Sequence, residues 1–264
     1  MSAIIIENGL VHYEALGRGR PLIFIHGWLG SWRYWVSAMD DLSDGYRTYA
    51  LDLWGFGDSD RRKEGYSLTS YIALVQKFMD ELGIWRAPLV GHALGGVVAL
   101  HFAATHPERV EQVMAVSIPL DGSAVSRSLA SFTGHDRDVV GRILGRRNLS
   151  AYPEVSQEAG KIDGFAVANS VQAVLGANLE EVLQAVEVPV LLVHGRNDPV
   201  IHPPDEARLD GFDGNVRIIA LDGARHFPML EEANRFNRLL RAFLETGGDL
   251  QALELKEEWR RRWR

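Results

Sequence analysis

The chain has 264 residues, of which 46% are hydrophobic and 24% are charged. This length and composition suit one soluble domain with an insertion, and they exclude a disordered or collagen-like chain. A net charge of −7 excludes a general electrostatic attraction to nucleic acid or to an anionic membrane. The absence of cysteine excludes disulfides, thiolate nucleophiles and cysteine-ligated zinc.

The first residues, 1–9, contain no basic segment ahead of an apolar run. No later stretch reaches the roughly 18 consecutive apolar residues that indicate a membrane helix. We therefore expect a cytoplasmic protein without a membrane span.

Strand-like segments alternate with helical patterns along much of the chain. Residues 4–7 and 10–15 flank Asn8-Gly9, a dipeptide that tolerates the positive φ angles of a type I′ turn, so a hairpin is predicted. Residues 67–82 have apolar side chains at helical spacing and end before Gly83, a typical helix stop. Short apolar runs typical of buried parallel strands occupy residues 22–25, 49–53, 88–90, 113–116, 189–193 and 216–221. This alternation predicts an α/β fold with a mostly parallel, doubly wound sheet.

The alternation stops between Asp121 and Glu187, where apolar residues fall at helical spacing and no strong strand signal occurs. We interpret residues 121–187 as a small helical cap inserted into a core made of residues 1–120 and 188–264.

The last segment, 249–264, places leucines and tryptophans among charges and ends in several arginines. This pattern predicts an amphipathic helix packed on the body, with cations at the negative end of its dipole. A partner site or a membrane-surface site is the alternative.

Residues 88–100 run from a buried strand through a glycine-flanked turn into a helix, which is the context of the nucleophile elbow G-x-S-x-G. The turn reads Gly91-His92-Ala93-Leu94-Gly95, so Ala93 occupies the place of the nucleophilic serine. The elbow strains its central residue, and the flanking glycines leave room for the neighbouring strand and helix.

Four further motifs lie in a fixed order along the chain, two before the elbow and two after it. They are His26-Gly27-Trp28 after a strand, the loop Asp52–Ser59, Gly195–Pro199 around Asp198, and Gly223–Phe227 around His226. Together with the elbow, they resemble the α/β-hydrolase superfamily, in its branch of small capped serine esterases and lactonases, over nearly the whole chain. The resemblance implies the α/β-hydrolase fold with its cap.

The resemblance also implies roles for five residues. Residue 93 is the nucleophile position, Asp198 is the acid, and His226 is the base that takes the serine proton and returns it to the leaving alkoxide. The backbone N–H groups of Trp28 and Leu94 are the expected oxyanion hole. This machinery implies hydrolysis of a small-molecule carboxylic ester or lactone through an acyl-enzyme, without cofactor or metal.

Alanine has no lone pair, so Ala93 cannot attack a carbonyl, and we expect this chain to be inactive. One explanation is a deliberate serine-to-alanine change that yields an inert, substrate-trapping protein. The other is a natural family member that has lost catalysis and binds a small ligand. The intact acid, histidine and oxyanion turn favour the first.

Other chemistries of the fold stay open. Relatives with aspartate at the elbow open epoxides or carbon–halogen bonds, but the turn His26–Leu29 lacks the proline that epoxide hydrolases usually carry there. A reaction that uses the histidine and the acid without a covalent step is a further alternative.

The remaining polar candidates have simpler interpretations. Asp121 follows the sixth strand and is a weaker candidate for the acid, while Asp52 is expected to accept bonds from loop N–H groups. His101 and His106 are five residues apart, so they do not share a helix face as metal ligands. Three histidines beside strand ends are expected to be packed, hydrogen-bonded supports: His26, His92 and His194.

Overall fold

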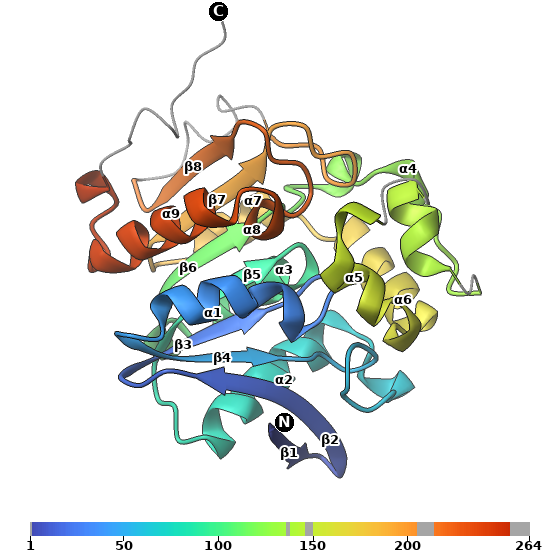
Figure 1. The fold of residues 1–264 in the computed structure, drawn as a ribbon, viewed down its shortest axis with the longest axis horizontal. Coiled ribbons are helices and arrows are strands. Elements are labelled where there is room, and N and C mark those ends of the chain that lie inside the picture. The colour runs from blue at the N-terminus through green and yellow to red at the C-terminus, as the bar shows by residue number, and fades with distance from the viewer. Residues whose placement is uncertain (1, 136–137, 146–149, 205–213, 254–264) are drawn as a thin grey trace, which may run out of the picture.

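The computed structural model describes residues 2–135, 138–145, 150–204 and 214–253. Within these residues, eight strands form one sheet in the order β1-β2-β4-β3-β5-β6-β7-β8 (Figure 1). The pairs β1·β2 and β2·β4 are antiparallel, and the other pairs are parallel. The strands are β1 Ser2–Ile6, β2 Gly9–Leu16, β3 Arg20–Ile25, β4 Tyr46–Leu51, β5 Ala87–His92, β6 Val110–Val116, β7 Val190–Gly195 and β8 Val216–Leu221. The predicted α/β fold with a mostly parallel sheet is confirmed.

Helices cover both faces of the sheet, which explains why its central strands are apolar without alternation. On one face α1 packs against α9, and on the other α3 packs against α2 and α7 (Figure 1). All residues of β5 and β7 are buried, whereas the edge strand β8 is only partly buried. The helices on the two faces are α1 Val36–Leu42, α2 Leu68–Glu81, α3 Leu94–Thr105, α7 Leu179–Ala185 and α9 Ala233–Glu245.

The N-terminal hairpin forms, but the predicted position of its turn is wrong by one residue. The positive φ angles belong to Glu7 (50°) and Asn8 (63°), and Gly9 is the first residue of β2. A Cβ atom at Gly9 would lie 2.6 Å from Arg62 Cδ and 2.9 Å from the Trp54 ring. Glycine therefore suits this position because these two side chains pack against the strand, and not because the turn requires it.

The predicted helix over residues 67–82 is confirmed as α2. Ser67 is its N-cap and accepts a hydrogen bond from the Ser70 N–H at 3.1 Å, so an otherwise unpaired helical donor is satisfied. Gly83 follows the helix with a φ of 66°, a conformation that glycine adopts at low cost.

The segment between β6 and β7 is helical, as predicted. Its helices α4 (Arg127–Ala130), α5 (Pro153–Glu158) and α6 (Gly164–Leu175) lie beyond the carboxyl ends of the strands (Figure 1). In contrast, α7 packs against α3 on the face of the sheet. We keep the cap over 121–187 as a proposal, in which α4 to α6 cover the strand ends and α7 leads back into the core.

The predicted C-terminal helix over 249–264 falls largely on residues 254–264, which lie outside the described residues. Before them, Leu250–Ala252 form one short 3₁₀ turn, and Leu250 and Leu253 are buried. Among the helices of the described residues, none is long and apolar enough to cross a membrane.

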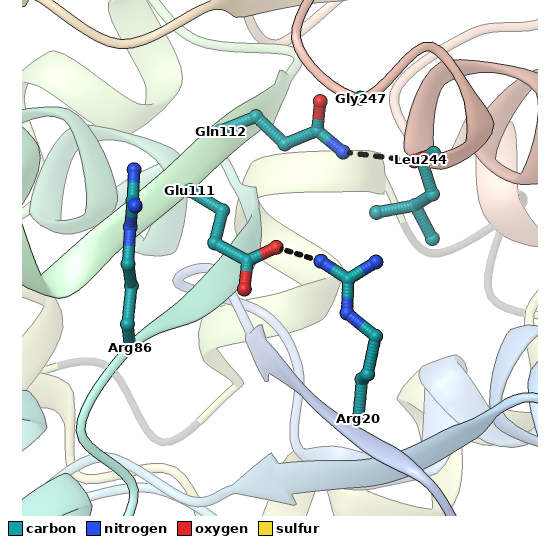
Figure 2. A pocket seen from close by; sticks show the side chains of 6 residues that line it. All are labelled: Arg20, Arg86, Glu111, Gln112, Leu244 and Gly247. Carbon is teal, nitrogen blue, oxygen red and sulfur yellow. Dashed lines mark hydrogen bonds and ion pairs between the residues drawn. The ribbon is translucent and has the colours of Figure 1, made fainter.

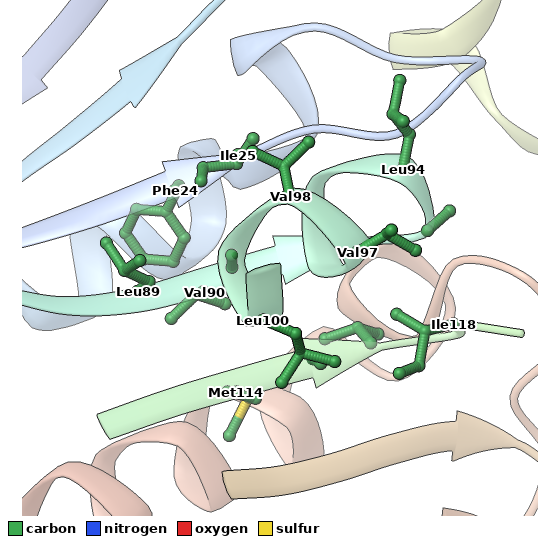
Figure 3. Packing of buried hydrophobic residues seen from close by; sticks show 14 of the residues in the cluster. Phe24, Ile25, Leu89, Val90, Leu94, Val97, Val98, Leu100, Met114 and Ile118 are labelled. Carbon is green, nitrogen blue, oxygen red and sulfur yellow. The ribbon is translucent and has the colours of Figure 1, made fainter. Parts of the chain in front are cut away.

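Helix α3 lies close against the central strands. Its side chains are apolar on nearly all sides, and Val97, Val98 and Leu100 pack among residues of β3, β5 and β6 (Figure 3). At Gly95 an added Cβ atom would lie 2.2 Å from the Ile25 carbonyl oxygen. Because that neighbour is backbone, only glycine permits this approach of α3 to β3.

We predict that Gly95→Ala lowers the free energy of unfolding by about 1–3 kcal/mol, the usual cost of overpacking a tight core. Denaturant unfolding measures the change. Gly45→Ala is the matched control, because an added Cβ at Gly45 meets nothing within 4 Å. Equal stability of the two variants would show that α3 has room to move.

Candidate active site

Residue 93 has the strained conformation of an elbow. Ala93 follows β5 and precedes α3, with φ 47° and ψ −113°. Its N–H donates to the Val116 carbonyl at 2.8 Å, and its carbonyl accepts from the Val97 N–H at 3.1 Å. An added Cβ at Gly91 would lie 2.3 Å from the Gly95 carbonyl oxygen, so the turn closes only with glycine on that side. Positive φ is uncommon for alanine, and such strain tends to mark functional sites.

The structure brings Asp198 and His226 together at the same edge of the sheet. Asp198 follows β7 and His226 follows β8, and the Asp198 Oδ2 atom lies 2.9 Å from His226 Nδ1. Asp198 Oδ1 accepts hydrogen bonds from the N–H groups of Val200 (2.8 Å) and Ile201 (3.0 Å). Both Asp198 and His226 are buried. An Nδ1–H that donates to the carboxylate leaves Nε2 of His226 as the basic atom.

The electrostatics of Asp198 suit this arrangement. Burial by itself would raise the pKa of Asp198, but the charge of His226, the hydrogen bond with it and the two N–H donors hold that pKa below its usual value. Asp198 is therefore a carboxylate at neutral pH. Asp121, the weaker candidate for the acid, instead accepts from the Ser123 N–H at 2.8 Å and caps a short turn at the start of the cap segment.

The turn after β3 lies directly against the elbow. An added Cβ at Gly27 would lie 2.9 Å from the Ala93 Cβ. His26 donates from Nδ1 to the Gly27 carbonyl at 2.9 Å, and its Nε2 accepts from the Leu53 N–H at 2.9 Å. Burial lowers the pKa of His26, so the neutral ring can fill both roles. Trp28, the next residue, is buried.

A buried chain of hydrogen bonds joins this turn to the His226 loop. The Gly27 N–H donates to the Tyr34 hydroxyl, which lies 3.1 Å from His92 Nδ1. His92 Nε2 lies 2.8 Å from the His226 carbonyl oxygen. Because a carbonyl only accepts, the His92 proton is on Nε2, and Nδ1 accepts from Tyr34. Burial, followed by the charge of His226, lowers the pKa of His92 well below its usual value. His26 and His92 are thus the hydrogen-bonded supports that the sequence predicts.

The prediction of a hydrogen-bonded support is wrong for His194. Its ring is fully buried at the end of β7, and neither ring nitrogen has a hydrogen-bond partner among the described residues. Burial lowers its pKa to about 4, so the ring stays neutral. His101 and His106 lie at the end of α3 that is remote from Ala93.

Asp52 is the structural carboxylate that the sequence predicts. It accepts from the N–H groups of Trp32 (2.8 Å) and Asp58 (3.0 Å), and it also pairs with His12 Nδ1 at 2.8 Å. Oxygen and nitrogen atoms of His12, Asp52 and Asp58 lie close enough together to suggest a metal site. However, both Asp52 oxygens already accept hydrogen bonds, and the Lys161 ammonium lies 2.8 Å from Asp58. These contacts explain why the three residues lie together, with Asp52 as a hydrogen-bonded support of the loops that contain Trp32 and Asp58.

Sequence reasoning missed the hydrogen-bonding roles of Tyr34 and His12. Tyr34 carried a weak signal, because several aromatic residues gather just after the turn at His26–Trp28. The contacts themselves join segments far apart in the chain, which no local motif reveals.

A separate polar pocket lies at the opposite edge of the sheet, where β3, β5 and β6 begin (Figure 2). Its volume is about 270 Å³. An Arg20–Glu111 ion pair crosses it, and the Gln112 amide donates to the Leu244 carbonyl at 3.4 Å. This pocket is therefore distinct from the site at the edge that carries Ala93, Asp198 and His226.

Comparisons with known proteins agree with this geometry. The family model described as alpha/beta hydrolase fold matches residues 20–142. The dihydrolipoyllysine-residue acetyltransferase component of the acetoin cleaving system of Cupriavidus necator is 32% identical over 262 residues, which cover 90% of this chain and 67% of that protein. The 2-hydroxymuconate semialdehyde hydrolase of Pseudomonas sp. is 29% identical over 252 residues, 86% of this chain and 88% of that protein. This chain belongs to the α/β-hydrolase family.

A solved relative has the same fold. The meta-cleavage product hydrolase CumD of Pseudomonas fluorescens superposes with a TM-score of 0.76 at 26% identity, covering 93% of this chain and 98% of that one. That structure is of a serine-to-alanine variant complexed with acetates. The family and these relatives support a hydrolase in general.

We predict that this protein loses stability as the pH falls from about 6.5 toward 4. His26, His92 and His194 have lowered pKa values because burial disfavours their charged forms. The unfolded chain binds protons on these residues from about pH 6.5 downward, whereas the folded chain does not. Each such histidine then lowers the free energy of unfolding by up to roughly 1.4 kcal/mol per pH unit.

Denaturant unfolding between pH 7 and pH 4.5 measures this slope. His194→Gln should flatten the slope, whereas His202→Gln, at an exposed position, should leave it unchanged. A slope that is the same in all three proteins would contradict the assignment of a buried neutral ring to His194.

Proposed function

We propose that the site of this chain is that of a carboxylic ester or lactone hydrolase of the serine type, with alanine at the nucleophile position. The observation that carries the proposal is the elbow at Ala93, strained to a φ of 47° beside a buried Asp198–His226 pair joined at 2.9 Å. The oxyanion turn lies against the same residue. A strained backbone, an oriented base and nearby N–H donors are what acyl transfer to a serine requires.

With serine at residue 93, each group has a defined part in the reaction. His226 Nε2 would take the hydroxyl proton as the oxygen attacks the ester carbonyl, and would return the proton to the leaving alkoxide. Asp198 would orient the imidazole and stabilise its charged form. The N–H groups of Trp28 and Leu94 would bind the oxyanion, and water would then release the acid from the acyl-serine.

With alanine at residue 93, the first of these steps has no attacking atom. The donors of the proposed oxyanion hole belong to the backbone, so they remain, and the methyl group leaves space where the hydroxyl oxygen would be. We propose that this chain binds an intact ester but does not hydrolyse it through an acyl-enzyme. The retained Asp198–His226 pair favours a deliberate serine-to-alanine replacement as the origin of Ala93, and the codon in the parent gene decides this.

The second candidate is a natural protein that binds a small ligand without catalysis. The favouring observation is that Ala93 is fully buried and chemically inert, while His92 and His226 beside it keep their hydrogen-bond partners. An enzyme acting on epoxides or carbon–halogen bonds is the third candidate, which would need aspartate at residue 93. Placing serine or aspartate at residue 93 and measuring which substrates are then hydrolysed separates these candidates.

We predict that Ala93→Ser confers hydrolysis of short or medium aryl esters. The present chain should be slower by a factor on the order of 10⁶, the scale of losing the nucleophile in serine hydrolases. Initial rates with p-nitrophenyl esters measure the difference, and Ala93→Gly is the control because it also lacks a nucleophile. Ala93→Asp, assayed on epoxides and haloalkanes, tests the third candidate. Equal ester turnover by the serine and alanine forms would refute the assignment.

We predict different effects for the two candidate acids in the Ala93→Ser protein. His226→Ala should abolish turnover, and Asp198→Asn should lower kcat by about 10⁴, because the imidazole would lose its charged partner and its correct tautomer. Asp121→Asn should change kcat little, since Asp121 caps a turn. If Asp121→Asn is the more damaging change in a folded protein, Asp198 is not the acid.

A further inference from the structure

The side chain of Trp28 links the turn after β3 to helix α6 of the proposed cap. Its indole Nε1–H donates to the Ser170 Oγ at 3.0 Å, although the two residues are 142 positions apart in the chain. Ser170 lies on α6 and is fully buried, and Trp28 is 1% exposed. A buried indole N–H needs a partner, because leaving it unpaired costs free energy. This bond is therefore a specific link between the oxyanion turn and the cap.

The Ser170 hydroxyl is itself held in one orientation. Its Oγ lies 2.6 Å from the Ala166 carbonyl and 3.1 Å from the Val167 carbonyl, both in the preceding turn of α6. A hydroxyl has one proton, and here that proton points back to the helix, so a lone pair is left for the indole. The position of the Ser170 Oγ acceptor therefore depends on the position of α6.

Helix α6 is in turn seated on the core at its N-terminus. Asp163, its N-cap, accepts from the Phe165 N–H at 2.9 Å and from the Tyr66 hydroxyl at 2.8 Å. The Asp163 N–H donates to the Gly55 carbonyl at 2.8 Å. Ser170 is therefore placed by a short rigid path that begins in the core loop around Gly55.

We propose that Ser170 is a positioning residue for the oxyanion hole. Through the indole, α6 holds Trp28 in the conformation that directs its backbone N–H toward the developing oxyanion, so the hole is complete only with the cap seated. The core holds the other side of the turn through Gly27 and Tyr34. This inference rests on the proposed function, because it concerns the oxyanion donor of that reaction.

Kinetics in the Ala93→Ser protein test the proposal. Ser170→Ala removes the acceptor, and Trp28→Phe removes the indole donor while keeping a ring and the backbone N–H. Each should lower kcat about tenfold and change KM less than twofold, since the donor acts on the transition state. Combining them should cost no more than either alone, because both break the same bond. Ser170→Thr, which keeps the hydroxyl, should restore most of kcat.

Asn169→Ala is the matched control, because Asn169 is exposed on the same helix. Its kcat should equal that of the Ala93→Ser parent. Unchanged kcat in Ser170→Ala, or multiplicative losses in the double variant, would overturn the proposal. If Ser170→Ala does not fold, as judged by its Tm, the kcat of Trp28→Phe decides alone.

A measurement without turnover separates this inference from the proposed function. In the Ala93 chain, the indole N–H resonance of Trp28, assigned through Trp28→Phe, should shift and exchange faster in Ser170→Ala. If that resonance responds but Ala93→Ser hydrolyses no ester, the hydrogen bond is real and the proposed function is wrong. If it does not respond while Ala93→Ser is active, the proposed function stands and the role of Ser170 is refuted.

Discussion

The structure of this site depends on how closely α3 approaches the strands beneath it. The helix begins directly after Ala93 and approaches β3 so closely that an added Cβ at Gly95 would lie 2.2 Å from the Ile25 carbonyl oxygen and 2.5 Å from the His26 carbonyl oxygen. Ala93, which joins β5 to α3 at this close approach, has a positive φ, and the turn at Gly27 lies against it. The geometry of the elbow is therefore tied to this packing constraint. Strain at one residue is stabilised by the apolar contacts of the whole helix.

Neutral, buried histidines make the hydrogen bonds that hold the segments of the site together. His26 links the turn after β3 to the loop after β4, and His92 joins that turn to the His226 backbone through Tyr34. A neutral imidazole suits these places because it offers one donor and one acceptor, and burial keeps it uncharged. These bonds link the two halves of the site, which lie on opposite sides of β5.

Ala93 lies beside polar groups that are held in place without it. The acid, the imidazole and the proposed donors are held by backbone and by residues other than 93, so none of them depends on a hydroxyl there. In the proposed reaction, recognition of a carbonyl and attack on it are separable for this reason, because the first would use preorganised N–H groups and the second would need a lone pair that a methyl group lacks. Helix α6, part of the proposed cap, contacts this turn through the hydrogen bond from the Trp28 indole to Ser170.

The sequence by itself determined the α/β class, helix α2 with its stop at Gly83, the elbow around Ala93 and the loops that carry Asp198 and His226. These features depend on apolar periodicity, glycine placement and residues a few positions apart. Only the tertiary structure decided the turn at Glu7–Asn8, the His194 ring that has no partner among the described residues, the Tyr34–His92 chain and the bond from Trp28 to Ser170. Those depend on which surfaces meet after the sheet and the cap assemble, and side-chain contacts between distant segments leave no local pattern in the chain.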